Sequence, residues 1–307
     1  MEIKRVIAGM DFSDSAVTAA RWVSTHFAPN AEIIFVHSIF VPVPPRFLRG
    51  RFPSPEVVVS VAREGAEKRF RELTASFAPS RVRTETRVGQ PAEQISQVAT
   101  ERGADLVVVG KHGQRPGIWS RIGSTAEKLL GSSAIPVLLT PKIPEGPPKN
   151  VLLALEDPDD ISLAAGWLRY LTHRFSANIT ALHVVSSAIL SGILSAEASL
   201  SSGSQADVTG VDVTGVKDEI RESSSTWQRD FESAGLGAIA TEVTFGEPGQ
   251  EILFAATRLR SDLIVIGRAR SGAVRRALLG SVTSEVLREA PCPVLVVTAP
   301  EDEVVGG

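Results

Sequence analysis

One pattern occurs twice in this chain and constrains its fold more than any other feature. The apolar run 105–110 ends in glycine, and Gly123 follows thirteen residues after that glycine. The apolar run 261–267 also ends in glycine, and Gly280 follows at the same spacing. Unbroken apolar runs bounded by glycine are typical of buried parallel strands. Because the two copies lie so far apart in the chain, we predict two similar domains rather than a solenoid.

Strand patterns alternate with helix patterns through both halves of the chain. This alternation predicts an α/β fold, with two tandem Rossmann-like domains that each hold a five-stranded parallel sheet flanked by helices. The domains are expected at 1–143 and 149–300, on either side of a short proline-rich linker. In the first half, strands are expected at 6–10, 33–37, 83–88, 105–110 and 137–140, and helices at 14–28, 56–77, 91–103 and from 124 onward. Ser13 is the expected N-cap of the first of these helices.

Composition excludes several classes of protein. A chain of 307 residues with 43% hydrophobic residues is long and apolar enough for two packed cores. The net charge of −3 gives no support for nucleic-acid binding. Cys292 is the single cysteine, so it is expected to be either an inert buried thiol or a reactive one, and no disulfide framework forms. No apolar run reaches membrane-spanning length and the N-terminus enters a strand directly, so we expect a cytoplasmic protein without a membrane partner.

The glycine-rich segment after the fourth strand is the candidate ligand site. Glycine lets backbone N–H groups approach a ligand closely, and a helix beginning near Ser124 adds unpaired N–H donors and the positive end of its dipole. In a parallel sheet, ligands bind beyond the carboxyl ends of the strands where the strand order reverses. The ends of the first and fourth strands, at Asp11 and Gly110, are therefore expected to form an anion cradle suited to phosphates.

The spacing Gly110-x2-Gly113-x9-Gly123-Ser124, together with Asp11 after the first strand, resembles the nucleotide-binding pattern of the universal stress protein family in its tandem form. The resemblance implies ATP binding, with Mg²⁺ as a possible companion. It implies that Asp11 binds the ribose, that the backbone at Ser38 reads the adenine edge, and that the glycines and the following hydroxyl residues hold the phosphates. The implied first site consists of Gly9, Asp11, Ser38, Val109, Gly110, His112, Gly113, Gly123, Ser124 and Thr125.

The second copy departs from this pattern at two positions. Glu156 stands in place of the ribose aspartate, and Arg270 replaces the middle glycine. If that backbone position requires positive φ, a non-glycine residue there costs roughly 1–2 kcal/mol. The side chain of Arg270 would either fill the phosphate site or bind phosphate itself. The second site is expected to be degenerate, with Glu156, Gly267, Gly280 and Ser281 as its remaining residues.

The resemblance also implies pairing through the last strand of each domain. In a tandem chain, residues 137–140 would pair with 294–297 inside one molecule, as an intramolecular pseudo-dimer, and a homodimer is a further possibility. The expected function is a nucleotide-dependent regulatory module of the stress response. The alternatives are a slow ATPase on the same site and an interaction scaffold that uses the Ser- and Gly-rich insert 186–215.

Catalytic and metal-binding motifs are absent from the sequence. No Walker loop, Gly-x-Ser-x-Gly elbow or zinc-ligand spacing occurs, so no catalytic or metal residue is predicted. Asp11 has an alternative role as a cap for the next helix, and His112 an alternative as a solvated loop residue. His37 and His183 are expected to be packed structural residues. The proline-rich stretch 42–55 is expected to act as a lid over the nucleotide.

Overall fold

The computed structural model describes residues 1–41, 53–78, 81–113, 122–155, 161–186, 227–268 and 280–298. The chain divides into two compact units. The unit that we call the first consists of Glu2–Pro147, Arg268–Leu279 and Cys292–Gly307. The second unit consists of Met1, Pro148–Gly267 and Gly280–Pro291. Most of the 42–55 stretch and nearly all of the 186–215 insert lie outside the described residues.

A parallel sheet forms the centre of the first unit. Its strands run in the order β3-β2-β1-β4-β5, so the order reverses between β1 and β4. Their apolar side chains are almost fully buried in β1, β4 and β5, which explains why these runs lack polar interruptions. The strands are β1 (Arg5–Gly9), β2 (Glu32–Ile39), β3 (Val82–Val88), β4 (Leu106–Gly110) and β5 (Val137–Thr140).

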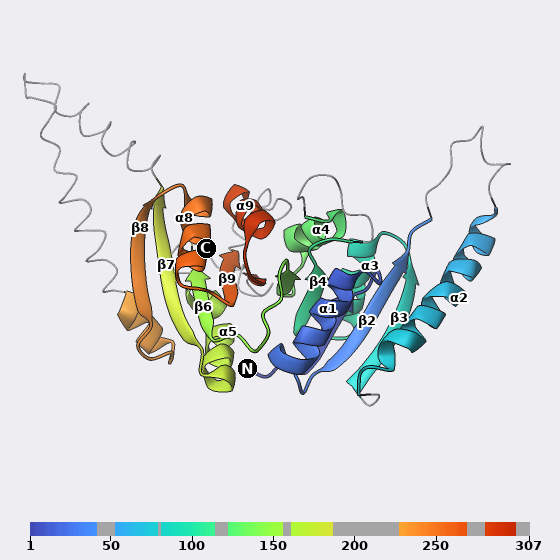
Figure 1. The fold of residues 1–307 in the computed structure, drawn as a ribbon, viewed down its shortest axis with the longest axis horizontal. Coiled ribbons are helices and arrows are strands. Elements are labelled where there is room, and N and C mark those ends of the chain that lie inside the picture. The colour runs from blue at the N-terminus through green and yellow to red at the C-terminus, as the bar shows by residue number, and fades with distance from the viewer. Residues whose placement is uncertain are drawn as a thin grey trace, which may run out of the picture. The chain divides into compact units, whose positions relative to one another are not determined.

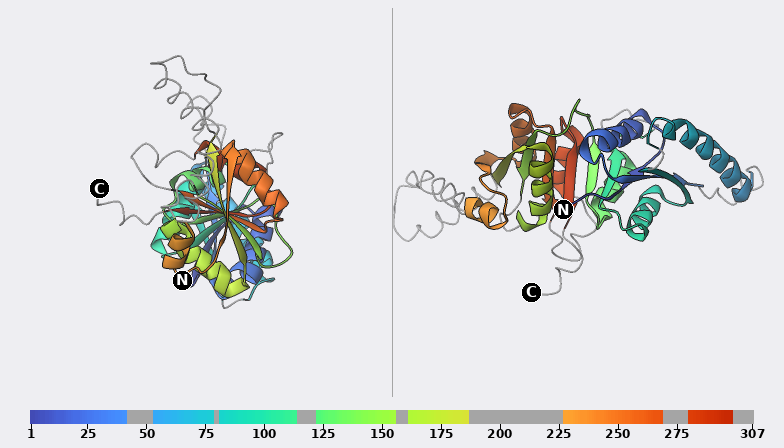
Figure 2. Two further views of the ribbon diagram at one scale, coloured as in Figure 1. Left: turned by 90° about the vertical axis from the view of Figure 1, so that its left-hand side faces the viewer. Right: turned by 90° about the horizontal axis from the view of Figure 1, so that it is seen from below.

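Helices cover both faces of this sheet. α1 and α2 lie on one face, and α3 packs beside α4 on the other (Figures 1 and 2). Ser13 caps α1 as predicted, because its hydroxyl accepts a hydrogen bond from the backbone N–H of Ala16. The helices are α1 (Asp14–Trp22), its π-helical continuation η1 (Val23–Phe27), α2 (Pro55–Thr74), α3 (Pro91–Glu101) and α4 (Ser124–Ser132).

A sixth strand of the first unit comes from the far end of the chain. β10 (Val294–Thr298) pairs antiparallel with β5, with Leu295 opposite Leu138 and Val296 opposite Val137. The hydroxyl of Thr298 also donates a hydrogen bond to the carbonyl of Ala134. The predicted pairing between 137–140 and 294–297 is therefore confirmed.

The second unit repeats the parallel arrangement in the order β9-β6-β7-β8. In both units an aspartate before the central strand ties two strands together. Asp105 accepts hydrogen bonds from the backbone N–H groups of Lys4 and Arg5, and Asp262 accepts the equivalent pair from Lys149 and Asn150. The elements are β6 (Asn150–Ala154), α5 (Ile161–Phe175), β7 (Asn178–Ser186), β8 (Ala240–Gly246), α8 (Pro248–Arg258), β9 (Leu263–Arg268) and α9 (Ser281–Glu289).

Candidate functional site

The first unit has a cavity at the carboxyl ends of β1 and β4, where the strand order reverses. Its volume is about 310 Å³, which lies within the usual range for small-molecule sites. All ten residues predicted for the first site line this one cavity. They are Gly9, Asp11, Ser38, Val109, Gly110, His112, Gly113, Gly123, Ser124 and Thr125.

Asp11 is held at the cavity by the turn that follows β1. One of its carboxylate oxygens, Oδ1, accepts hydrogen bonds from the backbone N–H of Ser13 at 3.0 Å and from the Ser13 hydroxyl at 2.6 Å. The Ser13 hydroxyl is also the cap of α1, so the helix start and the carboxylate are fixed by one side chain. The capping role expected as an alternative for Asp11 thus falls to Ser13, and Asp11 faces the cavity.

Phe12, which lies between Asp11 and Ser13, has a backbone conformation that aromatic residues rarely adopt. Its φ of 63° lies in the left-handed region, which costs roughly 1–2 kcal/mol for a residue with a Cβ. Ring contacts hold it in place: His37 and Phe70 each lie 4.9 Å away between ring centroids, and the Arg69 guanidinium lies 5.4 Å above the ring. Strain of this kind persists where surrounding contacts over-determine it, and it concentrates at functional sites.

His37 is a packed structural residue, as predicted. Its Nδ1 lies 2.7 Å from the carbonyl oxygen of Met10, so Nδ1 carries the proton and donates. The ring thereby fixes the last backbone carbonyl before Asp11. Ser38, the next residue, donates its hydroxyl to the carbonyl of Gly89, so its backbone is what remains for a ligand.

Gly113 is glycine because of a close approach and not because of its backbone angle. It is not among the described glycines with positive φ, so the condition for backbone strain at this position is not met in the first copy. A Cβ at this position would lie 2.7 Å from Oδ2 of Asp11. The carboxylate therefore occupies the space of the missing side chain, and any larger residue must push Asp11 away.

Gly110 and Gly9 have packing roles beside the cavity. A Cβ on Gly110 would lie 2.5 Å from the hydroxyl of Ser15 and 2.9 Å from the backbone nitrogen of Ala16, so α1 sits directly against this glycine. A Cβ on Gly9 would lie 2.9 Å from Cδ1 of Ile95 in α3. These glycines let helices on both faces of the sheet approach the rim of the cavity.

The N-terminus of α4 supplies hydrogen-bond donors to the same cavity. Gly123 is the N-cap residue and has no side chain to cap the helix, and the first backbone bond within the helix comes from the N–H of Glu127. The N–H groups of Ser124, Thr125 and Ala126 therefore lack a capping partner, and all three residues line the cavity. With the helix dipole and two hydroxyls, this end of the cavity is suited to an anion.

The sequence prediction missed seven residues that line the cavity: Met10, Ala16, Val36, His37, Pro91, Ile95 and Ala126. Pro91 and Ile95 of α3, and Val36 of β2, give it an apolar side opposite the polar rim. A signal for Pro91 was present, because the segment Gly-Gln-Pro at 89–91 matches Gly-Glu-Pro at 246–248 in the second copy. Such an apolar wall suits the face of a planar ring.

The second predicted site is described only in part. Gly267 lies in β9, Gly280 is the N-cap of α9, and Ser281 begins that helix. Like Gly123, Gly280 leaves its helix without a side-chain cap. Glu156 and Arg270 lie outside the described residues, so the departures of the second copy stay predictions from the sequence.

The fold and this cavity define an α/β protein with a ligand-sized cavity at the point where the strand order reverses. A model of the universal stress protein family matches residues 2–141 and again 148–298. The chain therefore belongs to the universal stress protein family, with two copies in tandem, and the resemblance inferred from the glycine spacing is confirmed.

Individual relatives agree with this assignment. A universal stress protein of Methanocaldococcus jannaschii is 34% identical over 148 residues, which cover 48% of this chain and 81% of that protein. A putative universal stress protein of Staphylococcus aureus is 27% identical over 154 residues, covering 50% and 86%. The crystal structure of a universal stress protein from Archaeoglobus fulgidus matches 98% of both chains with a TM-score of 0.68 at 16% identity, and so shares the fold.

The described residues contain neither a membrane-spanning helix nor a cluster of metal-binding side chains. None of their helices combines the length and the apolar character needed to cross a bilayer. No three or more His, Cys, Asp or Glu side chains in this part of the chain are grouped so that they would hold a metal ion.

Proposed function

We propose that this chain binds ATP in the cavity of the first unit and acts as a nucleotide-dependent regulatory module. The observation that carries the proposal is the convergence of all ten predicted residues on one cavity with an apolar wall and an uncapped helix end. A nucleotide needs both surfaces, because its base is planar and largely apolar while its phosphates are anionic.

Each part of ATP has a matching part of the cavity. The adenine ring would lie against Ile95 and Val36, with its edge at the backbone of Ser38. Oδ2 of Asp11 would accept a hydrogen bond from a ribose hydroxyl, while Oδ1 is held by Ser13. The phosphates would reach the uncapped N–H groups at Ser124 and Thr125.

The charge of the phosphates requires compensation. Among the described residues that line the cavity there is no lysine or arginine, so the helix dipole, the backbone N–H groups and His112 would share this role. Mg²⁺ bound to the phosphates would supply further charge, because it binds ATP through phosphate oxygens and water with few protein ligands.

The first experiment is to purify the chain without added nucleotide, denature it, and identify and count the nucleotide released. We expect ATP at about one molecule per chain, since the second copy lacks the aspartate and the glycine. ADP or AMP in place of ATP would favour slow hydrolysis, and nothing released, with no binding on titration, would refute the proposal and favour a scaffold.

Asp11→Ala provides the matched test of the site. Loss of a hydrogen bond to a charged group costs about 1.5–3 kcal/mol, so the affinity for ATP should fall about 10- to 100-fold. Asp14→Ala is the control, because Asp14 is exposed, begins α1 and does not line the cavity. Equal affinity in both variants would contradict the assigned role of Asp11.

A further inference from the structure

β3 is the outermost strand of the first unit and has an open backbone edge. Among the described residues it pairs with β2 alone. The backbone N–H of Gly89 donates to the carbonyl of Ile39 in β2, and successive residues of a strand point their backbone groups to opposite sides. The groups of Arg83, Glu85 and Arg87 therefore face β2, and those of Val82, Thr84, Thr86 and Val88 face outward.

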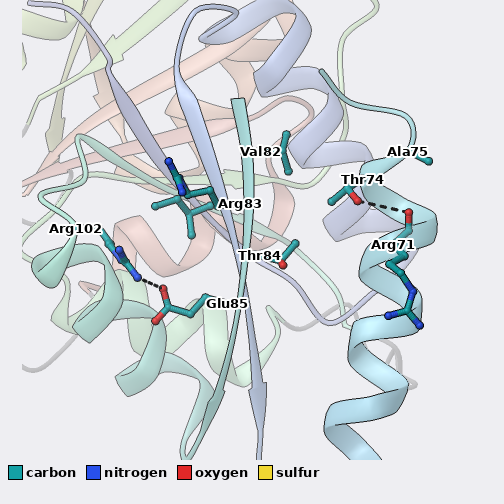
Figure 3. A pocket seen from close by; sticks show the side chains of 9 residues that line it. Arg71, Thr74, Ala75, Val82, Arg83, Thr84, Glu85 and Arg102 are labelled. Atoms are coloured by element: carbon teal, nitrogen blue, oxygen red, sulfur yellow. Dashed lines mark hydrogen bonds and ion pairs between the residues drawn. The ribbon is translucent and has the colours of Figure 1, made fainter. Parts of the chain in front are cut away.

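A groove of about 660 Å³ runs around this edge. Arg71 and Thr74 of α2 line it on one side of β3, and Glu85 with Arg102 on the other (Figure 3). Because α2 and α3 cover opposite faces of the sheet, the groove receives side chains from both faces. An occupant would thus meet α2 residues, the free backbone edge and Arg102 together.

In this region the carboxylates are less exposed than the arginines that pair with them. Glu85 and Glu32 are the inner members of their ion pairs, with side chains 16% and 27% exposed. Their partners Arg102 and Arg83 are 50% and 72% exposed. A guanidinium has five N–H donors, so these arginines keep donors free on the outer side after pairing with the acids beneath them.

Arg71 adds a further positive charge to the groove. It is exposed on α2, and its side chain makes no hydrogen bond or ion pair within the described part of the chain. The groove lining therefore holds three arginines, Arg71, Arg83 and Arg102, against one carboxylate, Glu85.

We propose that the β3 groove binds an extended acidic peptide segment of a partner protein, which adds as a further strand to β3. The backbone of the peptide would hydrogen-bond to the outward groups of Thr84 and Thr86, and side chains of alternate residues would meet the two faces. Acidic residues on these faces would contact Arg71 on one side and Arg83 with Arg102 on the other. This binding site is separate from the nucleotide cavity and does not depend on it.

A peptide fits the groove better than a nucleic acid. Arginines alone would suit either partner, since both carry acceptors and negative charge. The outward N–H and C=O groups of β3 alternate as donors and acceptors, and only another strand matches that alternation. The net charge of −3 also lacks the basic excess that nucleic-acid binding requires.

The test measures binding of a fluorescent peptide of repeated Glu-Glu-Thr-Thr, about ten residues long, by anisotropy with the full chain. This repeat places glutamates on both faces of an added strand. A Lys–Thr peptide of equal length controls for charge. The Glu–Thr peptide with every backbone nitrogen methylated keeps its charges but loses all N–H donors. We expect saturable binding of the first peptide alone, weakening as salt rises.

Two variants test the site itself. Arg71→Glu should weaken binding of the Glu–Thr peptide at least about tenfold, while Arg63→Glu, an equally exposed arginine on the same helix outside the groove, should leave it unchanged. Thr84→Pro should abolish binding without unfolding the chain, because the N–H that it removes faces outward and not β2.

Three outcomes would overturn the proposal. One is absence of saturable binding, and another is equal binding of the methylated or the Lys–Thr peptide. The third is binding of a single-stranded RNA oligomer in place of the peptide, unaffected by Thr84→Pro, which would assign the arginines to nucleic acid. If Thr84→Pro does not fold, the methylated peptide still separates strand addition from simple charge attraction.

Discussion

The two copies of the repeat are alike at the end of the central strand and at the start of the helix that follows it. They differ in the residues beside these two points. Both have a glycine at or near the end of a buried strand, Gly110 and Gly267, and a helix whose N-cap is glycine without a capping side chain, at Gly123 and at Gly280. Beside these points the first copy has Asp11 in close approach to Gly113. The sequence of the second copy has Glu156 and Arg270 at the equivalent positions. The glycines at the strand end and the helix start are therefore common to both copies, whereas the sequence of the second copy lacks the aspartate and the glycine that meet in the first.

The largest effect is expected when the first copy is given the residue of the second. In Gly113→Arg the new Cβ would collide with Oδ2 of Asp11, 2.7 Å away, and displace the ribose acceptor. Affinity for ATP measured by titration calorimetry should fall about 10- to 100-fold or more, while the thermal unfolding midpoint stays close to that of the wild type.

Gly65→Arg is the control for this substitution. It adds the same side chain at an exposed position of α2, where a Cβ would meet no atom within 4 Å. Unchanged ATP affinity in Gly113→Arg would show that ATP does not bind beside Asp11 and Gly113.

The reverse exchange tests the second copy. The double variant Glu156→Asp with Arg270→Gly restores both residues of the first copy, next to a helix start that already lacks a side-chain cap. We expect the nucleotide released per chain to rise from about one to about two, because the missing contact is worth roughly 1.5–3 kcal/mol. Arg270→Gly alone should give a smaller rise. A wild-type chain that already holds two nucleotides would contradict the expectation that the second copy is degenerate.

Gly110 and Gly123 differ in how closely other atoms would approach an added Cβ. Gly110→Ala puts a Cβ 2.9 Å from the backbone nitrogen of Ala16, which cannot move aside as a flexible side chain would. The free energy of unfolding should therefore fall by about 1–3 kcal/mol in urea denaturation. Gly123→Ala, whose Cβ would lie 3.4 Å from the carbonyl of Lys111, should change it far less. Equal losses would show that the approach of α1 does not decide the residue at 110.

The smallest effect concerns the ion network around Glu32, a position at which the second copy has asparagine. Glu32 lies between Arg83 and Arg5, and these guanidinium groups lower its pKa from the ordinary value of 4.5. The equivalent position in the second copy is Asn178, which holds the same backbone bond to the preceding strand. A lowered pKa in the folded state adds stability that is fully present above the ordinary pKa and is lost as the pH falls through the folded value.

Glu32→Gln should accordingly lower the free energy of unfolding at pH 7 by less than about 1 kcal/mol, because the three side chains are partly exposed. The difference from the wild type should shrink as the pH is lowered below 4.5. Glu93→Gln, at an exposed position on α3, is the control. A difference that stays constant down to pH 3, where most carboxylates are protonated, would rule out the carboxylate of Glu32 as its source.

Several features of the molecule were available from the sequence because they depend on local pattern. Apolar runs with glycine at their ends defined the central strands, and the serine before a helical pattern defined the cap of α1. The repeat predicted two related domains, and the family resemblance implied the pairing of 137–140 with 294–297, which β5 and β10 make. The ten residues predicted for the first site line one cavity, because the family pattern places them at the ends of neighbouring parallel strands, and their role in binding stays a prediction.

Tertiary structure alone decided how these residues meet. The reason for glycine at 113 is a carboxylate contributed by a residue about a hundred positions earlier, and no spacing rule reveals which side chain fills that space. The left-handed turn at Phe12 is held by rings from β2 and α2, and the open edge of β3 gains its basic groove from α2 and from the end of α3. Sequence pattern reports which face of an element is buried, whereas contacts between distant elements depend on where the folded sheet and helices bring side chains together.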